Sequence, residues 1–132
     1  MNILIIDDDV KFARYLADDL QNTYGHRVTW LKSADQALAN LREIRFDVII
    51  LDSMMPVPTD WSREDKDEAD FGLSTGLVLF NKIKKIIPLI PILIYTAKEI
   101  IPPDGSFVKV IRKPSLNSEI HEALLSFKIK QR

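Results

Sequence analysis

The chain has 132 residues, of which 46% are hydrophobic and 28% are charged, and its formal net charge is −1. This length suits one domain with a sizeable core, and the balanced charge argues against a disordered chain or a polyanion-binding surface. The chain has no cysteine, which excludes disulfides and thiolate metal sites. The first apolar run, Ile3 to Ile6, ends in three aspartates. It is therefore neither a signal peptide nor a membrane span, and we expect a soluble cytoplasmic domain.

Strands and helices are expected to alternate along the chain. Short continuous apolar runs predict buried strands, and apolar residues three or four apart predict helices. Asp9 and Ser33 are residue types that favour helix N-caps. Because crossovers between parallel strands are right-handed, this alternation predicts a parallel sheet with helices on both faces. The expected elements, in order, are a strand at 2–6, a helix at 10–21, strand 27–31, helix 33–43, strand 46–51, a helix from 77 to 86 or 87, strand 92–95, strand 107–111 and a helix from 117 to 127.

The stretch from Phe46 to Pro56 is the most informative, because its apolar run stops abruptly at Asp52. Such a run is too short for a helix and too continuous for a half-exposed strand, so it predicts a buried parallel strand. In open α/β sheets ligands bind at the carboxyl ends of the strands. Asp52 is therefore the leading candidate for a reactive group, the alternative being that it merely caps the strand.

Regular periodicity is lost between Pro56 and Leu77. Residues 57–74 are acidic: from Asp60 to Asp70 there are six acidic and two basic residues, a local charge of −4. A solvated, mobile loop is the first interpretation. The second is a lid or docking element beside the site, anchored by Trp61 and Phe71. Further along, prolines and a glycine between 97 and 106 leave room for little more than one helical turn.

Four of the five expected strands end in residues that can act on a phosphoryl group. Parallel strands bring their carboxyl ends to one edge of the sheet, so these side chains are expected to lie together. A carboxylate or hydroxyl at one strand end is common, but such residues at four strand ends on the same edge are hard to attribute to chance. The residues are Asp7 and Asp8, Asp52, Thr96 and Lys113.

Four segments resemble the signature motifs of the receiver domain of two-component response regulators. The resemblance covers Asn2 to about Phe127, as one receiver domain within residues 1–132. It implies a flavodoxin-like, doubly wound, five-stranded parallel sheet of order 2-1-3-4-5, with a long insertion after the third strand and a reduced fourth helix. The four segments are LIIDDD, DVIILDSMMP, ILIYTAK and RKP.

The resemblance also implies roles for the clustered residues. Asp52 is the expected phosphoacceptor, Thr96 the switch hydroxyl and Lys113 the base that pairs with the phosphate. Pro114 resembles the cis-proline that orients this lysine, so a cis bond is predicted after Lys113. The implied phosphodonor is the phosphohistidine of a sensor histidine kinase or a phosphotransfer protein, and the output partner is unknown.

Mg²⁺ is the expected cofactor. Carboxylates about 4 Å apart repel by about 4 kcal/mol per pair at an effective dielectric constant of 20, so a cation is needed to offset them. Magnesium prefers oxygen ligands and keeps some of its waters. The expected ligands are Asp8 and Asp52 directly, Asp7 through water, and the backbone carbonyl of Met54.

The chain is expected to accept and slowly lose a phosphoryl group without being an enzyme in the turnover sense. No direct nucleic-acid or membrane contact is expected. Val110 stands where the family usually has a switch aromatic, which favours a degenerate receiver that binds partners without phosphorylation as one alternative. The other alternative is a haloacid-dehalogenase-type phosphatase, since Asp7 to Asp9 resembles its D-x-D motif, but this leaves Asp52 unexplained.

Overall fold

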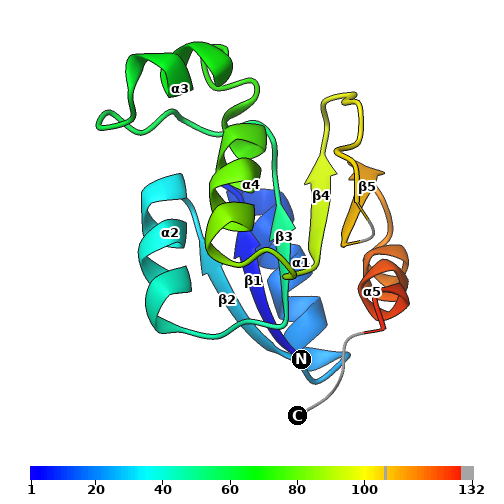
Figure 1. Ribbon diagram of the computed structural model, residues 1–132. Coiled ribbons are helices and arrows are strands. Elements are labelled where there is room, and N and C mark those ends of the chain that lie inside the picture. The colour runs from blue at the N-terminus through cyan, green and yellow to red at the C-terminus, as the bar shows by residue number, and fades with distance from the viewer. Residues whose placement is uncertain (106, 129–132) are drawn as a thin grey trace.

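The computed structural model describes residues 1–105 and 107–128. In this part of the chain one parallel sheet has the order β2-β1-β3-β4-β5, which confirms the predicted flavodoxin-like fold (Figure 1). Its strands are β1 (Asn2–Ile6), β2 (Arg27–Leu31), β3 (Val48–Leu51), β4 (Ile92–Thr96) and β5 (Val108–Arg112).

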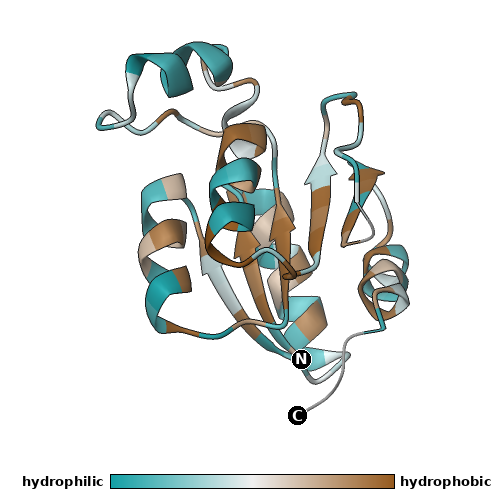
Figure 2. Cartoon of the chain, viewed as in Figure 1, coloured by the Kyte–Doolittle hydropathy of each residue, from teal (hydrophilic) through white to brown (hydrophobic). Residues whose placement is uncertain are grey.

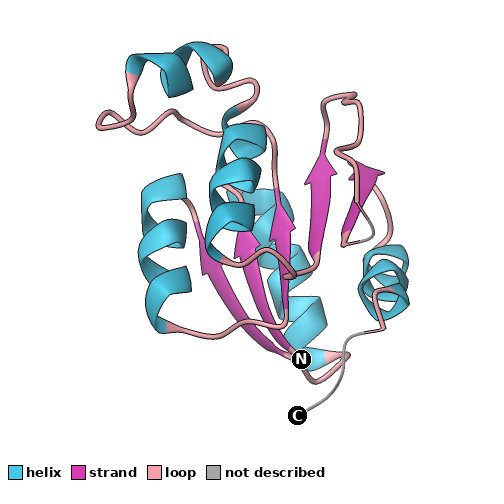
Figure 3. Ribbon diagram, viewed as in Figure 1, coloured by secondary structure: helices cyan, strands magenta, loops and turns pink. Residues whose placement is uncertain are grey.

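Helices cover both faces of the sheet (Figure 3). One face packs against α1 and α5, and the other packs against α2 and α4. The helices are α1 (Val10–Asn22), α2 (Ala34–Glu43), α3 (Arg63–Glu68), α4 (Thr75–Ile86) and α5 (Asn117–Ser126). No helix in the described ranges has the length and apolar character needed to cross a membrane.

The core consists of two apolar layers, one on each side of the sheet. Successive side chains of a strand point to opposite faces. Ile3 and Ile5 accordingly pack toward α1 and α5, whereas Leu4 and Ile6 pack toward α2 and α4. Figure 2 shows the resulting concentration of hydrophobic residues in the strands. A strand buried on both faces needs a continuous apolar run, which is why β1 and β3 could be predicted from the sequence.

The predicted boundaries needed small corrections. β3 begins at Val48, two residues later than expected, although Phe46 is buried and the Asp47 amide already donates to the Asn2 carbonyl. β5 is shifted by one residue, to Val108–Arg112, although the Phe107 carbonyl already accepts a bond from the Ile92 amide just before the strand begins. The predicted N-caps are confirmed by bonds from backbone amides to Asp9 and Ser33.

The inserted segment, residues 57–74, lies above the carboxyl edge of the sheet (Figure 1) and is not simply a loop. It contains the short helix α3, whose N-cap Ser62 accepts a bond from the Asp65 amide. Trp61 is only 9% exposed, which confirms it as an anchor. Phe71 is 100% exposed, so its prediction as an anchor is wrong.

Helix α4 holds the inserted segment through Lys82. The Lys82 ammonium lies 2.7 Å from an Asp65 carboxylate oxygen and 5.1 Å from the centre of the Trp61 ring. Between β4 and β5, residues 97–105 and Phe107 contain no helix, not even the single turn that was expected. Of the two connections at this edge, the inserted segment is therefore the one that contains a helix.

Candidate functional site

The backbone pairing of the strands brings three functional residues to the same edge. The Asp7 amide bonds to the Leu31 carbonyl, and the Asp52 amide bonds to the Ile6 carbonyl, both at 3.0 Å. The Lys113 amide bonds to the Thr96 carbonyl at 2.9 Å. Each of these residues thus lies just past a strand end, where the ladder of hydrogen bonds fixes its backbone.

Lys113 joins two buried carboxylates. Its Nζ lies 2.6 Å from Asp7 Oδ2 and 3.2 Å from Asp52 Oδ2, and the side chains of Lys113, Asp7 and Asp52 are 4%, 7% and 5% exposed. The rings of Phe12 and Tyr95 lie 5.2 and 5.5 Å from the same nitrogen. Aromatic faces stabilise a desolvated cation. The sequence prediction that Asp7, Asp52 and Lys113 lie together is confirmed.

Backbone amides bind the remaining carboxylate oxygens. Asp7 Oδ1 accepts from the Asp9 amide at 2.8 Å, and Asp52 Oδ1 accepts from the Met54 amide at 3.2 Å. Asp8 is exposed at the mouth of the site. The Met54 amide thus binds the Asp52 carboxylate. That the Met54 carbonyl is a metal ligand stays a prediction.

Burial and the contacts between the charged groups together determine the pKa values of this cluster. Burial raises the pKa of Asp7 to about 7, against the opposing hydrogen bond from Lys113. Burial and the nearby charge of Asp52 raise the pKa of Asp8. Burial opposes the charge on Lys113, but its bonds to Asp7 and Asp52 outweigh this and raise the pKa of its ammonium.

The acidic residues fit a divalent cation. Asp7, Asp8 and Asp52 each offer a carboxylate oxygen, and these oxygens lie within 4.8 Å of one another. With the three carboxylates ionised, the single ammonium of Lys113 leaves a net charge of −2, which a divalent cation balances. An all-oxygen ligand set of this kind suits Mg²⁺.

Thr96 is fully buried at the end of β4 and is bonded to a residue that sequence reasoning missed. Its Oγ1 lies 2.7 Å from Ser53 Oγ, and Ser53 is also fully buried. The Lys98 amide donates to Thr96 Oγ1 at 3.3 Å. The two hydroxyls are 43 positions apart in sequence, so only the pairing of β3 with β4 brings them together.

The end of the inserted segment is bonded to the chain that follows Asp52. The Met55 amide donates to the Gly72 carbonyl at 3.0 Å, and the Thr75 hydroxyl donates to the Met55 carbonyl at 2.6 Å. The Lys98 ammonium donates to Ser74 Oγ at 2.7 Å. The connection after β4 and the inserted segment are therefore in direct contact.

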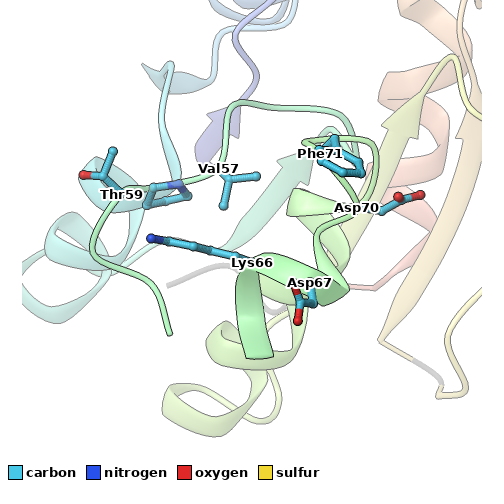
Figure 4. Close-up of a pocket in the computed structure, with 7 residues that line it drawn as sticks. Val57, Thr59, Lys66, Asp67, Asp70 and Phe71 are labelled. Atoms are coloured by element: carbon cyan, nitrogen blue, oxygen red, sulfur yellow. The ribbon is translucent and has the colours of Figure 1, made fainter. Parts of the chain in front are cut away.

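Two cavities border the inserted segment. One, of about 460 Å³, opens onto Asp8 and Asp52 and has Phe71 to Leu73 as part of its wall. The other, of about 370 Å³, lies within the segment, where Lys66 extends toward Val57 and Thr59 while Asp70 and Phe71 lie at the opposite end (Figure 4). The inserted segment thus forms part of the entrance to the acidic site.

The end of β5 tests one prediction and shows the surroundings of Val110. The bond between Lys113 and Pro114 is cis, as predicted. Val110 is half-buried and packs on the core layer of α2 and α4. The neighbouring strand β4 carries an aromatic residue, Tyr95, which pairs with Ile111 of β5. The Tyr95 hydroxyl accepts a hydrogen bond from the Ser115 amide at 3.0 Å.

Comparisons with known proteins agree with this fold and site. Residues 3–60 match the model of the response regulator receiver domain family. The chain is 34% identical over 97 residues to the transcriptional regulatory protein ZraR of Salmonella typhimurium, and 32% identical to ZraR of Escherichia coli K12. Each match covers 74% of this chain but 18% of the relative.

Solved receiver structures have the same fold. The response regulator TrrA of Thermotoga maritima, in complex with Mg²⁺ and a beryllium fluoride, superposes with a TM-score of 0.73 at 23% identity, covering 96% of this chain and 97% of that one. The HemR receiver domain of Leptospira biflexa gives 0.71 at 24% identity, covering 99% and 96%.

The sheet order defines a flavodoxin-like fold, with a cluster of carboxylates at the carboxyl edge of the sheet. The sequence matches make the assignment specific: the chain belongs to the receiver domain family of response regulators.

Proposed function

We propose that this chain acts as a single receiver domain that accepts a phosphoryl group on Asp52 in a phosphorelay. The observation that carries the proposal is the placement of the Asp52 carboxylate, which lines the open cavity and bonds to Lys113 beside two further acids. The donor is the phosphohistidine of a sensor histidine kinase or a phosphotransfer protein. These partners are proteins, and no nucleic-acid or membrane contact is proposed for these residues.

In the proposed reaction an Asp52 carboxylate oxygen attacks the phosphorus of the phosphohistidine. The new P–O bond forms as the P–N bond breaks, and the released imidazole takes up a proton from solvent. Lys113 binds a phosphoryl oxygen and neutralises part of its charge, which is the main requirement of phosphoryl transfer. Thr96 donates a hydrogen bond to the acyl phosphate once it has formed.

Asp7, Asp8 and Asp52 would hold Mg²⁺, with the Met54 carbonyl as a further ligand. When bound, Mg²⁺ neutralises carboxylate and phosphoryl charge. Water hydrolyses the acyl phosphate slowly afterwards, so the chain loses the group without turning over a separate substrate.

The test is incubation with acetyl phosphate and Mg²⁺, followed by intact mass spectrometry. Wild type should gain one phosphate adduct, and the adduct should be absent in Asp52→Asn and after chelation of Mg²⁺. Asp67→Asn, in the exposed helix α3, is the matched control and should keep the adduct. If wild type is folded and gains no adduct, the proposal fails, and a receiver that binds partners without phosphorylation takes its place.

A further inference from the structure

The buried pair formed by Ser53 and Thr96 lies next to the carboxylates of Asp7, Asp8 and Asp52. Their hydroxyl oxygens are 2.7 Å apart, and neither residue has exposed surface. Within residues 1–105 and 107–128, the Ser53 hydroxyl has no hydrogen-bond partner other than Thr96. Thr96 therefore satisfies a buried polar group that has no access to water.

Ser53 cannot follow Thr96 if the threonine turns. The Gly76 amide donates to the Ser53 carbonyl at 2.9 Å. A Cβ added to Gly76 would lie 1.9 Å from the Asp52 carbonyl oxygen and 2.6 Å from Ser53 Cα. The first turn of α4 thus packs directly against this backbone. On its other side, the Asp52 amide is bonded to β1. The Ser53 backbone is fixed between the sheet and α4.

Either hydroxyl can be the donor in the bond between Ser53 and Thr96. If the Thr96 side chain turns to bring its hydroxyl to a phosphoryl oxygen, it moves away from the fixed Ser53, and the bond is lost whichever hydroxyl donates. A buried hydroxyl left without a partner is unfavourable. We propose that Ser53 is a positioning residue that holds the Thr96 hydroxyl in the unphosphorylated state and thereby lowers the affinity of the site for a phosphoryl group. This inference rests on the proposed function of Asp52.

The proposal predicts a gain on mutation. Ser53→Ala removes the group that competes for Thr96, so Thr96 is free to bind the phosphoryl oxygens. A residue with a merely structural role would leave the affinity unchanged or lower it when truncated. The sign of the change in affinity therefore separates the two roles.

The experiment measures binding of beryllium fluoride, a mimic of the phosphoryl group, to the full chain in the presence of Mg²⁺ by calorimetry or ¹⁹F NMR. Ser53→Ala should bind about three- to thirty-fold more tightly than wild type. In a Thr96→Ala background the same substitution should change the affinity by less than about two-fold. Thr75→Val is the matched control, because it removes another buried hydroxyl bond, to the Met55 carbonyl, without touching Thr96. It should not tighten binding.

Two results would overturn the role of Ser53 alone. The first is equal or weaker binding by Ser53→Ala when wild type binds the mimic and acetyl phosphate modifies Asp52. The second is a gain that persists without the Thr96 hydroxyl. Failure of wild type to bind the mimic or to form the adduct would overturn both this inference and the proposed function.

Discussion

The ammonium group of Lys113 bonds to two carboxylates that are almost fully buried with it. Taking one partner away from a buried ion pair leaves uncompensated charge, which is far more unfavourable than losing an exposed pair. Without Lys113, the carboxylates of Asp7 and Asp52 would repel each other and the exposed Asp8. Lys113 thus stabilises the unphosphorylated protein as well as serving the proposed chemistry.

Lys113→Met is expected to lower the free energy of unfolding by about 3 to 5 kcal/mol in the presence of EDTA. Part of this loss should return when Mg²⁺ is added, because the cation would neutralise the carboxylates of Asp7 and Asp52 that have lost their partner. Thermal and urea unfolding with and without Mg²⁺ measure both effects. Lys82→Met, which breaks the half-exposed pair with Asp65, is the control and should cost at most about 1 kcal/mol. Equal losses in the two variants would contradict the burial argument.

At the residue scale, the site could be predicted where chemistry follows directly on a buried strand. Asp7 and Asp52 each come directly after an apolar run, and Lys113 follows the predicted last strand, 107–111, by two positions, so the sequence alone places the three at one edge. Ser53 gave no such signal, because a small hydroxyl residue beside a strand end is common. Thr96 was predicted, but its contact with Ser53 becomes apparent only once the register of β3 against β4 is known.

At the scale of elements, α4 is fixed to the site through its first turn. Gly76 lies where a side chain would collide with the backbone that carries Asp52, although its own backbone is ordinary helix. Gly25 differs: its φ is +73°, and no atom lies within 4 Å of an added Cβ. Gly76 is therefore required because of close packing, whereas Gly25 is required because of its backbone conformation.

Gly76→Ala is expected to destabilise the fold by about 2 to 4 kcal/mol, because backbone atoms cannot give way as a flexible side chain can. Gly25→Ala should cost about 1 to 2 kcal/mol, from its left-handed conformation alone. Urea unfolding compares the two variants. The Gly76 variant should also be modified more slowly by acetyl phosphate, since α4 would displace Asp52, whereas the Gly25 variant should match wild type. A Gly76 variant as stable and as reactive as wild type would refute the close packing.

Most elements were predictable because each has either a continuous apolar run or a clear helical period. Helix α3 was missed because its own six residues, REDKDE, have no buried member. The segment is held by the flanking residues Trp61 and Ala69, both buried. Ser62 followed by Asp65 is an N-terminal capping pattern that could have indicated the helix.

At the scale of the whole molecule, a second polar cluster joins α5 to the start of β2. The Met1 amino group lies 2.9 Å from His26 Nδ1, and His26 Nε2 lies 2.9 Å from His121 Nε2. Since a protonated amine only donates, His26 accepts at Nδ1 and donates from Nε2 to His121. The His121 ring also stacks on Tyr24. Both histidines must be neutral for this chain of bonds to exist.

Burial lowers the pKa of both His26 and His121 from the usual value of 6.5, and the Met1 amine adds to the effect. As the pH falls through 6.5, the histidines of the unfolded chain take up protons while those of the folded chain stay neutral. The free energy of unfolding therefore falls on acidification. Urea unfolding at about pH 7.5 and about pH 5.5 should show a larger loss in wild type than in His26→Phe/His121→Phe. The carboxylates titrate in both proteins, so the difference isolates the histidines. An equal loss in the two proteins would exclude this contribution.

The inserted segment departs from and returns to neighbouring points of the chain, which meet at the hydrogen bond between Met55 and Gly72. The acids, the threonine and the lysine of the site all lie outside residues 57–74, and lengthening such an excursion adds little closure entropy. Recognition at the entrance can consequently diversify during evolution while the phosphoryl chemistry beneath it stays constant. The same topology makes this segment a natural place to graft a foreign recognition sequence in a designed signalling protein.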